Sequence, residues 1–144
     1  MTEAVKDFTS TLQDYPLQIE FEEDPRSPIC SLAPLEFELA VFNLLKNAKE
    51  ALKAQKADEP KVFIKISSGE THCFVDISDN GAVISDSDFE RMGSVFKSGK
   101  ASGLGIGLSI VRSIVQNHNG SLVLERGKNG GLVCRIRLPI LNAQ

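Results

Sequence analysis

The stretch that decides the fold is GLGIGLSIVRSIVQNHNGSLVLERGKNGGLVCRIRLP, residues 103–139. Leu108 and, seven residues later, Val115 mark a helical stripe, and Asn119-Gly120 provides a left-handed stop after it. Two alternating segments, SLVLER and LVCRIRLP, then flank the turn GKNGG, as the strands of a hairpin do. One face of the second strand is apolar, which predicts a sheet with a buried side, at Leu132, Cys134, Ile136 and Leu138.

Further helices and strands are expected before this stretch. A long helix begins at Pro34, which suits the first helical position, and ends near Lys56. Strands are expected at PLQIEFEE, KVFIKIS and THCFVDIS, the last two forming an antiparallel hairpin. A short helix is expected at residues 85–92, with Ser85 or Ser87 as its cap. The apolar stripe of the long helix is predicted to consist of Leu35, Leu39, Phe42, Leu45, Ala48 and Leu52.

These elements predict a single domain, residues 1–144, because this length suits one compact core. Helices among mostly hairpin-joined strands indicate an α/β (α+β) two-layer sandwich. In it, helices cover one face of a mixed, mostly antiparallel sheet, and the other face is partly wet. Residues 1–15 begin with an amphipathic helix, and the glycine- and serine-rich segment 93–103 is expected to be a mobile loop.

Composition excludes several classes of protein. The net charge of −3, with Lys and Arg scattered along the chain, argues against nucleic acid as a partner. No apolar segment is long enough to span a bilayer, so we expect no membrane contact by this domain and a cytoplasmic location. Cys30, Cys73 and Cys134 lack metal or redox spacing, and we expect them to be reduced thiols.

Alternate glycines at 103, 105 and 107 precede and enter the helix that carries Leu108. A helix N-terminus with unhindered amides is a natural site for phosphate oxygens, although the glycines can equally serve close packing. A P-loop is excluded, because Ser94 and Ala101 stand at two of its required positions. A dinucleotide fingerprint is excluded as well, because no parallel strand-helix-strand unit surrounds the motif.

Asn43 and Asn47 stack on one face of the long helix, four residues apart. Asparagine is a mediocre helix former, so the pair suggests a polar task on a partly buried surface. The amide oxygen of Asn47 is a ligand type that Mg²⁺ accepts when it is shared with substrate phosphates. Ordinary surface amides remain the alternative for either residue alone.

Asp79-Asn80-Gly81 ends an apolar strand. A turn is the default interpretation of this tripeptide. An ionised Asp79 at a strand end can also accept a hydrogen bond from the exocyclic amine of adenine, while Gly81 lets the backbone approach the base.

In chain order, residues 43–48 (NLLKNA), 79–81 (DNG) and 103–108 (GLGIGL) resemble the N, G1 and G2 boxes of the GHKL superfamily. This superfamily groups gyrase-type ATPases, heat-shock chaperones, histidine kinases and mismatch-repair proteins. The resemblance covers nearly the whole chain and implies the Bergerat-type sandwich that binds ATP with Mg²⁺, the metal being held by Asn47. The residues it assigns to the nucleotide are Lys46, Asn47, Asp79, Gly81, Gly103, Leu104, Gly105, Gly107 and Leu108.

The branch most resembled is the catalytic domain of two-component sensor histidine kinases. Gyrase-like ATPases carry a water-activating glutamate where this chain has Asn43, and asparagine cannot act as that base. The resemblance therefore implies transfer of the γ-phosphoryl group, with Asn43, Asn47 and Lys100 as catalytic residues and 93–103 as the ATP lid.

By the same resemblance, the phosphoryl acceptor is a histidine of a separate dimerisation domain, and a response-regulator aspartate follows. That domain is expected before residue 1, with residues 1–15 as linker helix, in a parent protein that can be membrane-anchored. Neither histidine of the chain makes a good acceptor, since His118 suits capping or packing and His72 lies in a strand. We expect the isolated domain to be monomeric and to hydrolyse little ATP.

Two alternatives stay open. One is a regulatory GHKL protein, such as an anti-sigma factor that phosphorylates serine or merely binds a partner. The other is a non-catalytic nucleotide-binding adaptor, suggested by Val83 at the usual place of a second G1 glycine and by Glu50 where many relatives carry a basic residue.

Overall fold

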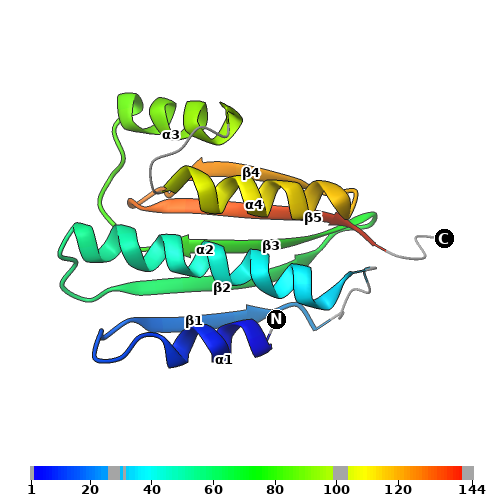
Figure 1. The fold of residues 1–144 in the computed structure, drawn as a ribbon, viewed down its shortest axis with the longest axis horizontal. Coiled ribbons are helices and arrows are strands. Elements are labelled where there is room, and N and C mark those ends of the chain that lie inside the picture. Colours follow the sequence, from blue (N-terminus) through cyan, green and yellow to red (C-terminus); the bar gives the residue numbers. More distant parts are fainter. Residues whose placement is uncertain (1, 26–29, 31, 99–103, 141–144) are drawn as a thin grey trace.

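A mixed five-stranded sheet forms one layer of the protein, and helices form the other (Figure 1). The computed structural model describes residues 2–25, 30, 32–98 and 104–140. Two-layer packing buries the apolar face of the sheet against the apolar stripes of the helices, as the sequence predicted. The elements in chain order are α1 (Thr2–Ser10), β1 (Gln18–Glu23), α2 (Pro34–Ala54), β2 (Lys61–Ser68), β3 (His72–Asp79), α3 (Asp86–Ser98), α4 (Leu104–Asn117), β4 (Ser121–Arg126) and β5 (Leu132–Pro139).

The strand order is β1-β2-β3-β5-β4, and only the β1–β2 pair is parallel. The other three pairs are antiparallel, which confirms the mostly antiparallel sheet. A parallel pair needs a long crossover, and here α2 provides it. Both predicted hairpins, β2–β3 and β4–β5, are present.

Figure 1 shows α1, α2 and α4 side by side over one face of the sheet. The apolar side chains of β2, β3 and β5 that point toward these helices are almost fully buried, including Val62, Ile64 and Ile136. The predicted apolar face of β5 is confirmed, because Cys134 and Leu138 are buried beside Ile136. The hydrophobic core therefore lies between the sheet and the helical layer.

The predicted stripe of α2 is wrong at its first two positions. Leu35 and Leu39 are 81% and 48% exposed, whereas Phe37 and Val41 are buried in their place. At 3.6 residues per turn, Leu35 and Leu39 lie on the side of the helix that points away from the buried residues. Their side chains therefore face outward.

The helix α1 packs against α2 and belongs to the core. Its Ala4 and Phe8 are each 1% exposed. The Phe8 ring meets the ring of Phe42 of α2 edge to face, with centroids 5.9 Å apart. Such an arrangement places the positive edge of one ring against the negative face of the other. Whether this segment also connects to another domain stays a prediction.

The opposite face of the sheet carries charged side chains in cross-strand register. Glu22, Lys65, Asp76 and Arg135 follow one another across β1, β2, β3 and β5. Arg135 donates two hydrogen bonds to the Asp76 carboxylate, at 2.8 and 2.9 Å. Neighbouring charges of opposite sign favour this register and keep the face polar, in agreement with the expected wet side.

The short helix expected at residues 85–92 extends to Ser98, so the predicted loop is wrong for residues 93–98. Gly93 is tolerated inside α3, because one glycine weakens a helix by only about 1 kcal/mol. Residues 99–103, the rest of the predicted lid, lie outside the described residues. Ser85 is confirmed as the cap, since its Oγ accepts a hydrogen bond from the Asp88 amide at 3.2 Å.

The end of α4 is joined to the start of α2 by His118. The amide of Ala33, the residue before α2, donates to His118 Nε2 at 2.8 Å, and His118 Nδ1 lies 2.7 Å from the carbonyl oxygen of Ile114. These partners require a neutral ring with the proton on Nδ1. The expected capping role of His118 is confirmed, and so is the left-handed stop, because Asn119 has a φ of 60°.

Candidate functional site

A cavity of about 310 Å³ opens where α2, α3 and α4 meet the ends of β3 and β5. Its size falls in the range of small-ligand pockets, which are mostly apolar with a few polar groups. The cavity is lined by Leu44, Asn47, Ala48, Glu50, Ala51, Gln55, Ile77, Asp79, Ile84, Met92, Leu108, Gly131, Leu132 and Cys134.

None of the helices in the described part of the chain is long and apolar enough to cross a membrane.

Asp79 is the acidic group at the end of β3. Its two carboxylate oxygens accept hydrogen bonds from the amides of Gly81, at 2.8 Å, and Leu132, at 3.3 Å. Burial raises the pKa of the Asp79 carboxyl above its ordinary value, and the two amide hydrogen bonds partly counteract this rise. Each oxygen retains a lone pair for a ligand, so the carboxylate can accept a hydrogen bond from a donor in the cavity.

Gly81 lies between Asp79 and the end of α2. A Cβ atom at this position would lie 2.7 Å from both Asp79 Oδ1 and Gln55 Oε1, so any side chain here would displace these two groups. Gln55 in turn accepts a hydrogen bond from the Ala82 amide at 2.8 Å. The loop after β3 is therefore attached to α2 through a side chain that the sequence analysis did not single out.

The turn between β4 and β5 forms part of the same wall. Gly130 and Gly131 have φ values of 114° and 77°, which glycine adopts without strain. A Cβ on Gly131 would approach the Asp79 backbone oxygen to 2.1 Å. The Gly131 amide donates to the Ala82 carbonyl oxygen at 2.9 Å. Close backbone packing between this hairpin and the 79–82 loop fixes the orientation of the Asp79 carboxylate.

Asn43 and Asn47 of α2 meet Gly107 of α4. A Cβ on Gly107 would lie 3.2 Å from both amide atoms of Asn47 and 3.6 Å from Asn43 Oδ1. The amide nitrogen of Asn43 already donates to the Leu39 carbonyl oxygen at 2.8 Å, which leaves its oxygen facing Gly107. The structure thus brings the amide pair and the glycine motif, which are 60 residues apart in the sequence, into contact.

The Asn47 amide nitrogen is buried and has no hydrogen-bond partner among the residues that the structure describes. An unsatisfied buried donor costs about 1–3 kcal/mol. Because Asn47 also lines the cavity, a ligand oxygen is a suitable partner for this group. The amide oxygen is of the type that a hard cation accepts alongside phosphate oxygens, so Asn47 fits a magnesium–phosphate ligand.

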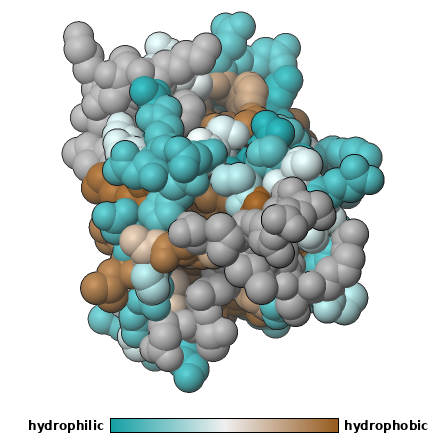
Figure 2. Space-filling view, turned by 90° about the vertical axis from the view of Figure 1, so that its right-hand side faces the viewer, coloured by the Kyte–Doolittle hydropathy of each residue, from teal (hydrophilic) through white to brown (hydrophobic). Residues whose placement is uncertain are grey.

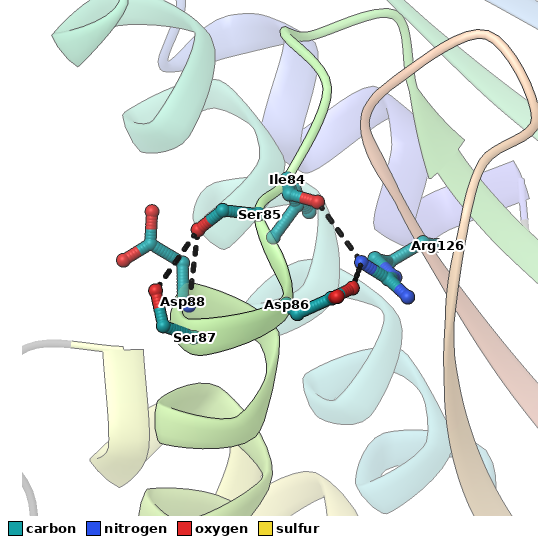
Figure 3. A network of polar contacts seen from close by, with 6 residues as sticks. All are labelled: Ile84, Ser85, Asp86, Ser87, Asp88 and Arg126. Carbon is teal, nitrogen blue, oxygen red and sulfur yellow. Dashed lines mark hydrogen bonds and ion pairs between the residues drawn. The ribbon is translucent and has the colours of Figure 1, made fainter.

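The outer wall of the cavity is held by Arg126, the last residue of β4 (Figure 3). Its Nη1 donates to the Ile84 carbonyl oxygen at 3.2 Å and to Asp86 Oδ1 at 2.6 Å. Its guanidinium carbon also lies 5.2 Å from the centre of the Phe89 ring. Ile84 precedes Asp86 and Met92 follows Phe89 in the sequence, and both Ile84 and Met92 line the cavity. Arg126 therefore attaches the start of α3 to the sheet.

The other predicted site residues have different positions. Leu108 lines the cavity, and Leu104 and Gly105 begin α4 as expected. Lys46 is on the exposed side of α2 and is not among the lining residues. Lys100 and Gly103 lie outside the described residues.

The two departures from the GHKL pattern are also placed. The Val83 side chain is 80% exposed and is not part of the cavity lining, so it does not fill the cavity. Glu50 lines the cavity, which brings an additional carboxylate close to any anionic ligand. Lys49 does not offset this charge, because its ammonium group reaches the Thr11 carbonyl oxygen at 3.5 Å.

Comparisons with known proteins identify the family of the chain. The sequence pattern of one family, described as histidine kinase-, DNA gyrase B-, and HSP90-like ATPase, matches residues 33–142. The sensor protein FixL of Bradyrhizobium diazoefficiens is 30% identical over 123 residues, which cover 85% of this chain and 24% of FixL. Sporulation kinase B of Bacillus subtilis is 27% identical over 139 residues, 94% of this chain and 32% of that protein. The chain thus spans about a quarter to a third of the length of these two relatives.

Solved structures show the same fold. The nucleotide-free catalytic domain of histidine kinase ThkA superposes with a TM-score of 0.79 at 24% identity, covering 96% of this chain and 90% of that domain. The histidine kinase domain of the E. coli osmosensor EnvZ gives a TM-score of 0.67 at 27% identity, covering 96% of this chain and 84% of that one.

Proposed function

The chain belongs to the family of histidine kinase-, DNA gyrase B- and HSP90-like ATPases, and from this premise we propose that it is the ATP-binding catalytic domain of a sensor histidine kinase. In this proposal it binds Mg-ATP and donates the γ-phosphoryl group to a histidine of a separate dimerisation domain. A response-regulator aspartate receives the group next, in two-component signal transduction. Transfer takes place in the cytoplasm, with no membrane contact by this domain.

The observation that carries the proposal is the unpartnered Asn47 amide nitrogen at one side of the cavity, beside Gly107 of the glycine motif. The Asp79 carboxylate lies at the wall formed by β3 and the β4–β5 turn. The adenine amine donates to Asp79, and the triphosphate lies against Asn47 and the N-terminal amides of α4. This arrangement gives one polar group to each end of the nucleotide and leaves the apolar lining to the base.

The chemistry required of these residues is positioning and charge stabilisation. Asn43 stands where gyrase-like enzymes carry a base, and its amide cannot remove a proton from water. Asn47 and the amides at the start of α4 hold the phosphates in line with the external imidazole. Asn47 would hold a Mg²⁺ ion, which would supply positive charge to the phosphates. Lys46 and Lys100 are proposed as further cationic contacts, with residues 93–103 covering the nucleotide.

The partner proposed for this domain is the dimerisation and phosphoacceptor domain of a longer kinase. The relatives FixL and sporulation kinase B, of which this chain covers 24% and 32%, have room for such a domain. Residues 1–15 are the proposed connection. The isolated domain is proposed to be monomeric.

Calorimetry tests nucleotide binding. Mg-ATP titrated into the wild-type domain should give measurable binding, and Asn47→Asp should weaken it at least about tenfold, because the variant replaces a donor by a charge facing phosphate. Asn117→Asp is the control. Asn117 is exposed at the end of α4, so this substitution adds the same charge away from the cavity. An absence of heat at millimolar nucleotide would support the alternative of a non-catalytic adaptor, which the Glu50 carboxylate at the cavity favours.

Phosphoryl transfer is tested separately. A histidine-containing dimerisation domain from a related kinase is added with labelled ATP and Mg²⁺. Acid-labile phosphohistidine is expected, whereas acid-stable phosphoserine would favour the regulatory, anti-sigma-factor-like alternative.

A further inference from the structure

Two cysteines that are far apart in the sequence meet at the end of the molecule where α2 begins. The sulfur atoms of Cys30, before α2, and Cys73, on β3, are 2.8 Å apart. Figure 2 views the protein from this end and shows hydrophilic residues interspersed with apolar ones. Both cysteines are free thiols. No spacing in the sequence indicated this pair, because 43 residues separate its members.

A metal does not explain the pair. Within the ranges that the structure describes, no group of three or more His, Cys, Asp or Glu residues could hold a metal ion. Simple burial does not explain it either, because one member is accessible. Cys30 is partly exposed, whereas Cys73 is only 4% exposed. Cys30 is therefore the more accessible residue of the pair, with the buried Cys73 sulfur 2.8 Å from its own.

Burial also lowers the reactivity of the Cys73 thiol. Burial, followed by the hydrogen bond to Cys30 and its charge, raises the pKa of Cys73 to about 12. Its thiolate is therefore scarce at neutral pH, and Cys73 is poorly suited to attack an oxidant first. The accessible Cys30 is the better first target, with Cys73 as the second thiol.

We propose that Cys30 and Cys73 form a site of oxidative modification, which a hydroperoxide converts into a disulfide between the start of α2 and β3. In the first step, the Cys30 sulfur attacks a peroxide oxygen. A sulfur–oxygen bond forms, the oxygen–oxygen bond breaks, and the leaving hydroxide takes up a proton to give water and a sulfenic acid. The Cys73 sulfur then attacks the Cys30 sulfur. The sulfur–sulfur bond forms, and the hydroxide that leaves Cys30 combines with the Cys73 proton to give water. Overall, the two thiols lose two electrons, and these reduce the peroxide.

The disulfide reinforces one end of α2. Cys30 lies three residues before Ala33, whose amide is bonded to His118, so the new bond and the hydrogen bond act on the same connection. Cys73 is at the start of β3 and Asp79 is at its end, six residues or about 20 Å along the strand. The proposal therefore rests on no part of the nucleotide site, and the two stand or fall separately.

Mass spectrometry tests the linkage directly. Trypsin places the three cysteines in three different peptides, 27–46, 66–91 and 129–135. After brief treatment with hydrogen peroxide, the intact mass should fall by about 2 Da, the two hydrogens lost on disulfide formation. A non-reducing digest should contain peptide 27–46 joined to 66–91, and dithiothreitol should separate them.

Variants identify the partners. Cys134→Ser should still form the link, because Cys134 is buried, its pKa is raised to about 12 by burial and the charge of Asp79, and it lies in a separate peptide. Cys30→Ser should abolish the link and leave Cys73 reduced. A link that includes Cys134, a disulfide between two molecules, or oxidation that stops at added oxygen on Cys30 would each overturn the proposal. If Cys73→Ser fails to fold, the partly exposed Cys30→Ser provides the same test.

Thermal unfolding gives a second measurement. A disulfide that closes a loop of about 44 residues should raise the Tm of the oxidised protein by about 10 °C, and dithiothreitol should reverse the rise. Peroxide should leave the Tm of Cys30→Ser unchanged. An oxidised wild-type protein with an unchanged or lower Tm contradicts the proposed position of the bond.

Discussion

Arg126, the last residue of β4, forms an ion pair with Asp86, the first residue of α3. Its Nη1 atom lies 2.6 Å from Asp86 Oδ1. Both side chains are solvent-accessible, at 41% and 90%, so the ion pair itself contributes little to the free energy of folding. Its importance is positional. Among residues 86–94 of α3, none belongs to the buried core, and the Arg126 contacts with Ile84, Asp86 and Phe89 hold the helix beside the cavity.

Replacing Arg126 by Gln should therefore affect the ligand more than the fold. We expect the Kd for ATP to rise about three- to tenfold, because the wall containing Ile84 and Met92 is released, while the free energy of unfolding falls by about 1 kcal/mol or less. Calorimetry and urea unfolding measure the two quantities. Arg91→Gln is the matched control, since it breaks an exposed ion pair within α3, to Asp88 at 3.1 Å, without releasing the helix. Equal effects of the two variants on Kd would refute the anchoring role.

Gly107→Ala should weaken ATP binding about tenfold or more. The added Cβ lies 3.2 Å from the Asn47 amide, which must shift by a few tenths of an ångström and so loses its alignment with a ligand in the cavity. Calorimetry measures the affinity, and circular dichroism checks that the fold is retained. Gly69→Ala is the control, because a Cβ there makes only an ordinary contact, 3.4 Å from the His72 carbonyl oxygen, at the end of the sheet away from the cavity. Normal affinity in Gly107→Ala would mean that Asn47 does not contact the nucleotide.

Nucleotide affinity should increase as pH rises through the raised pKa of Asp79. The ionised carboxylate accepts the hydrogen bond of the adenine amine, whereas the protonated group must first lose its proton. ADP affinities measured over a pH series that begins at the ordinary aspartate pKa of about 3.9 should show this increase. Asp79→Asn, which has no proton to lose, should bind weakly at every pH and lack this component of the profile. Parallel profiles for wild type and variant would contradict the assignment.

The effect of Asp79 on stability has the opposite sign. Its pKa is higher in the folded than in the unfolded protein, so the folded state binds the proton more tightly. This carboxyl therefore costs stability as pH rises from the unfolded pKa through the folded one, and the cost disappears as pH falls again. Urea unfolding of wild type and Asp79→Asn over the same range isolates this contribution as the difference between their slopes.

His118→Ala should lower the free energy of unfolding by about 1 kcal/mol, because it removes the hydrogen bond from the Ala33 amide and the side-chain contact with the Ile114 carbonyl oxygen. Urea unfolding measures the loss. His72→Ala is the control. The His72 side chain makes exposed hydrogen bonds with Thr71 at 2.8 Å and Arg137 at 3.5 Å, and its removal should cost about 0.5 kcal/mol or less.

The fold was largely predictable because burial imposes periods on the sequence. Alternation located β5, and helical spacing located α2 and α4, since each element buries one side. The errors occurred where apolar or glycine content misleads. Leu35 and Leu39 are apolar but exposed, and Gly93 lies within α3 because a single glycine weakens a helix by only about 1 kcal/mol.

The candidate site was predictable only in part. Three residues carry local signals in the sequence. Asn47 is a polar residue in a helix, Asp79 is an acid at the end of a strand, and Gly107 is a glycine at the start of a helix. Gln55 and Arg126 carry none, because each acts by reaching another element, at Ala82 and Asp86. Such contacts depend on tertiary placement, which no short sequence pattern encodes. The sulfur pair at the other end of α2 was missed for the same reason.

The close backbone contact between Gly131 and Asp79 also determines where a label can be inserted into the protein. An inserted epitope or fluorophore within residues 127–131 would push the strand-end acid out of place, although this hairpin looks from the sequence like a dispensable surface turn. The connection at Gly69 and Glu70, at the opposite end of the same sheet, offers the safer point of attachment for a label that reports on the domain without disturbing its ligand.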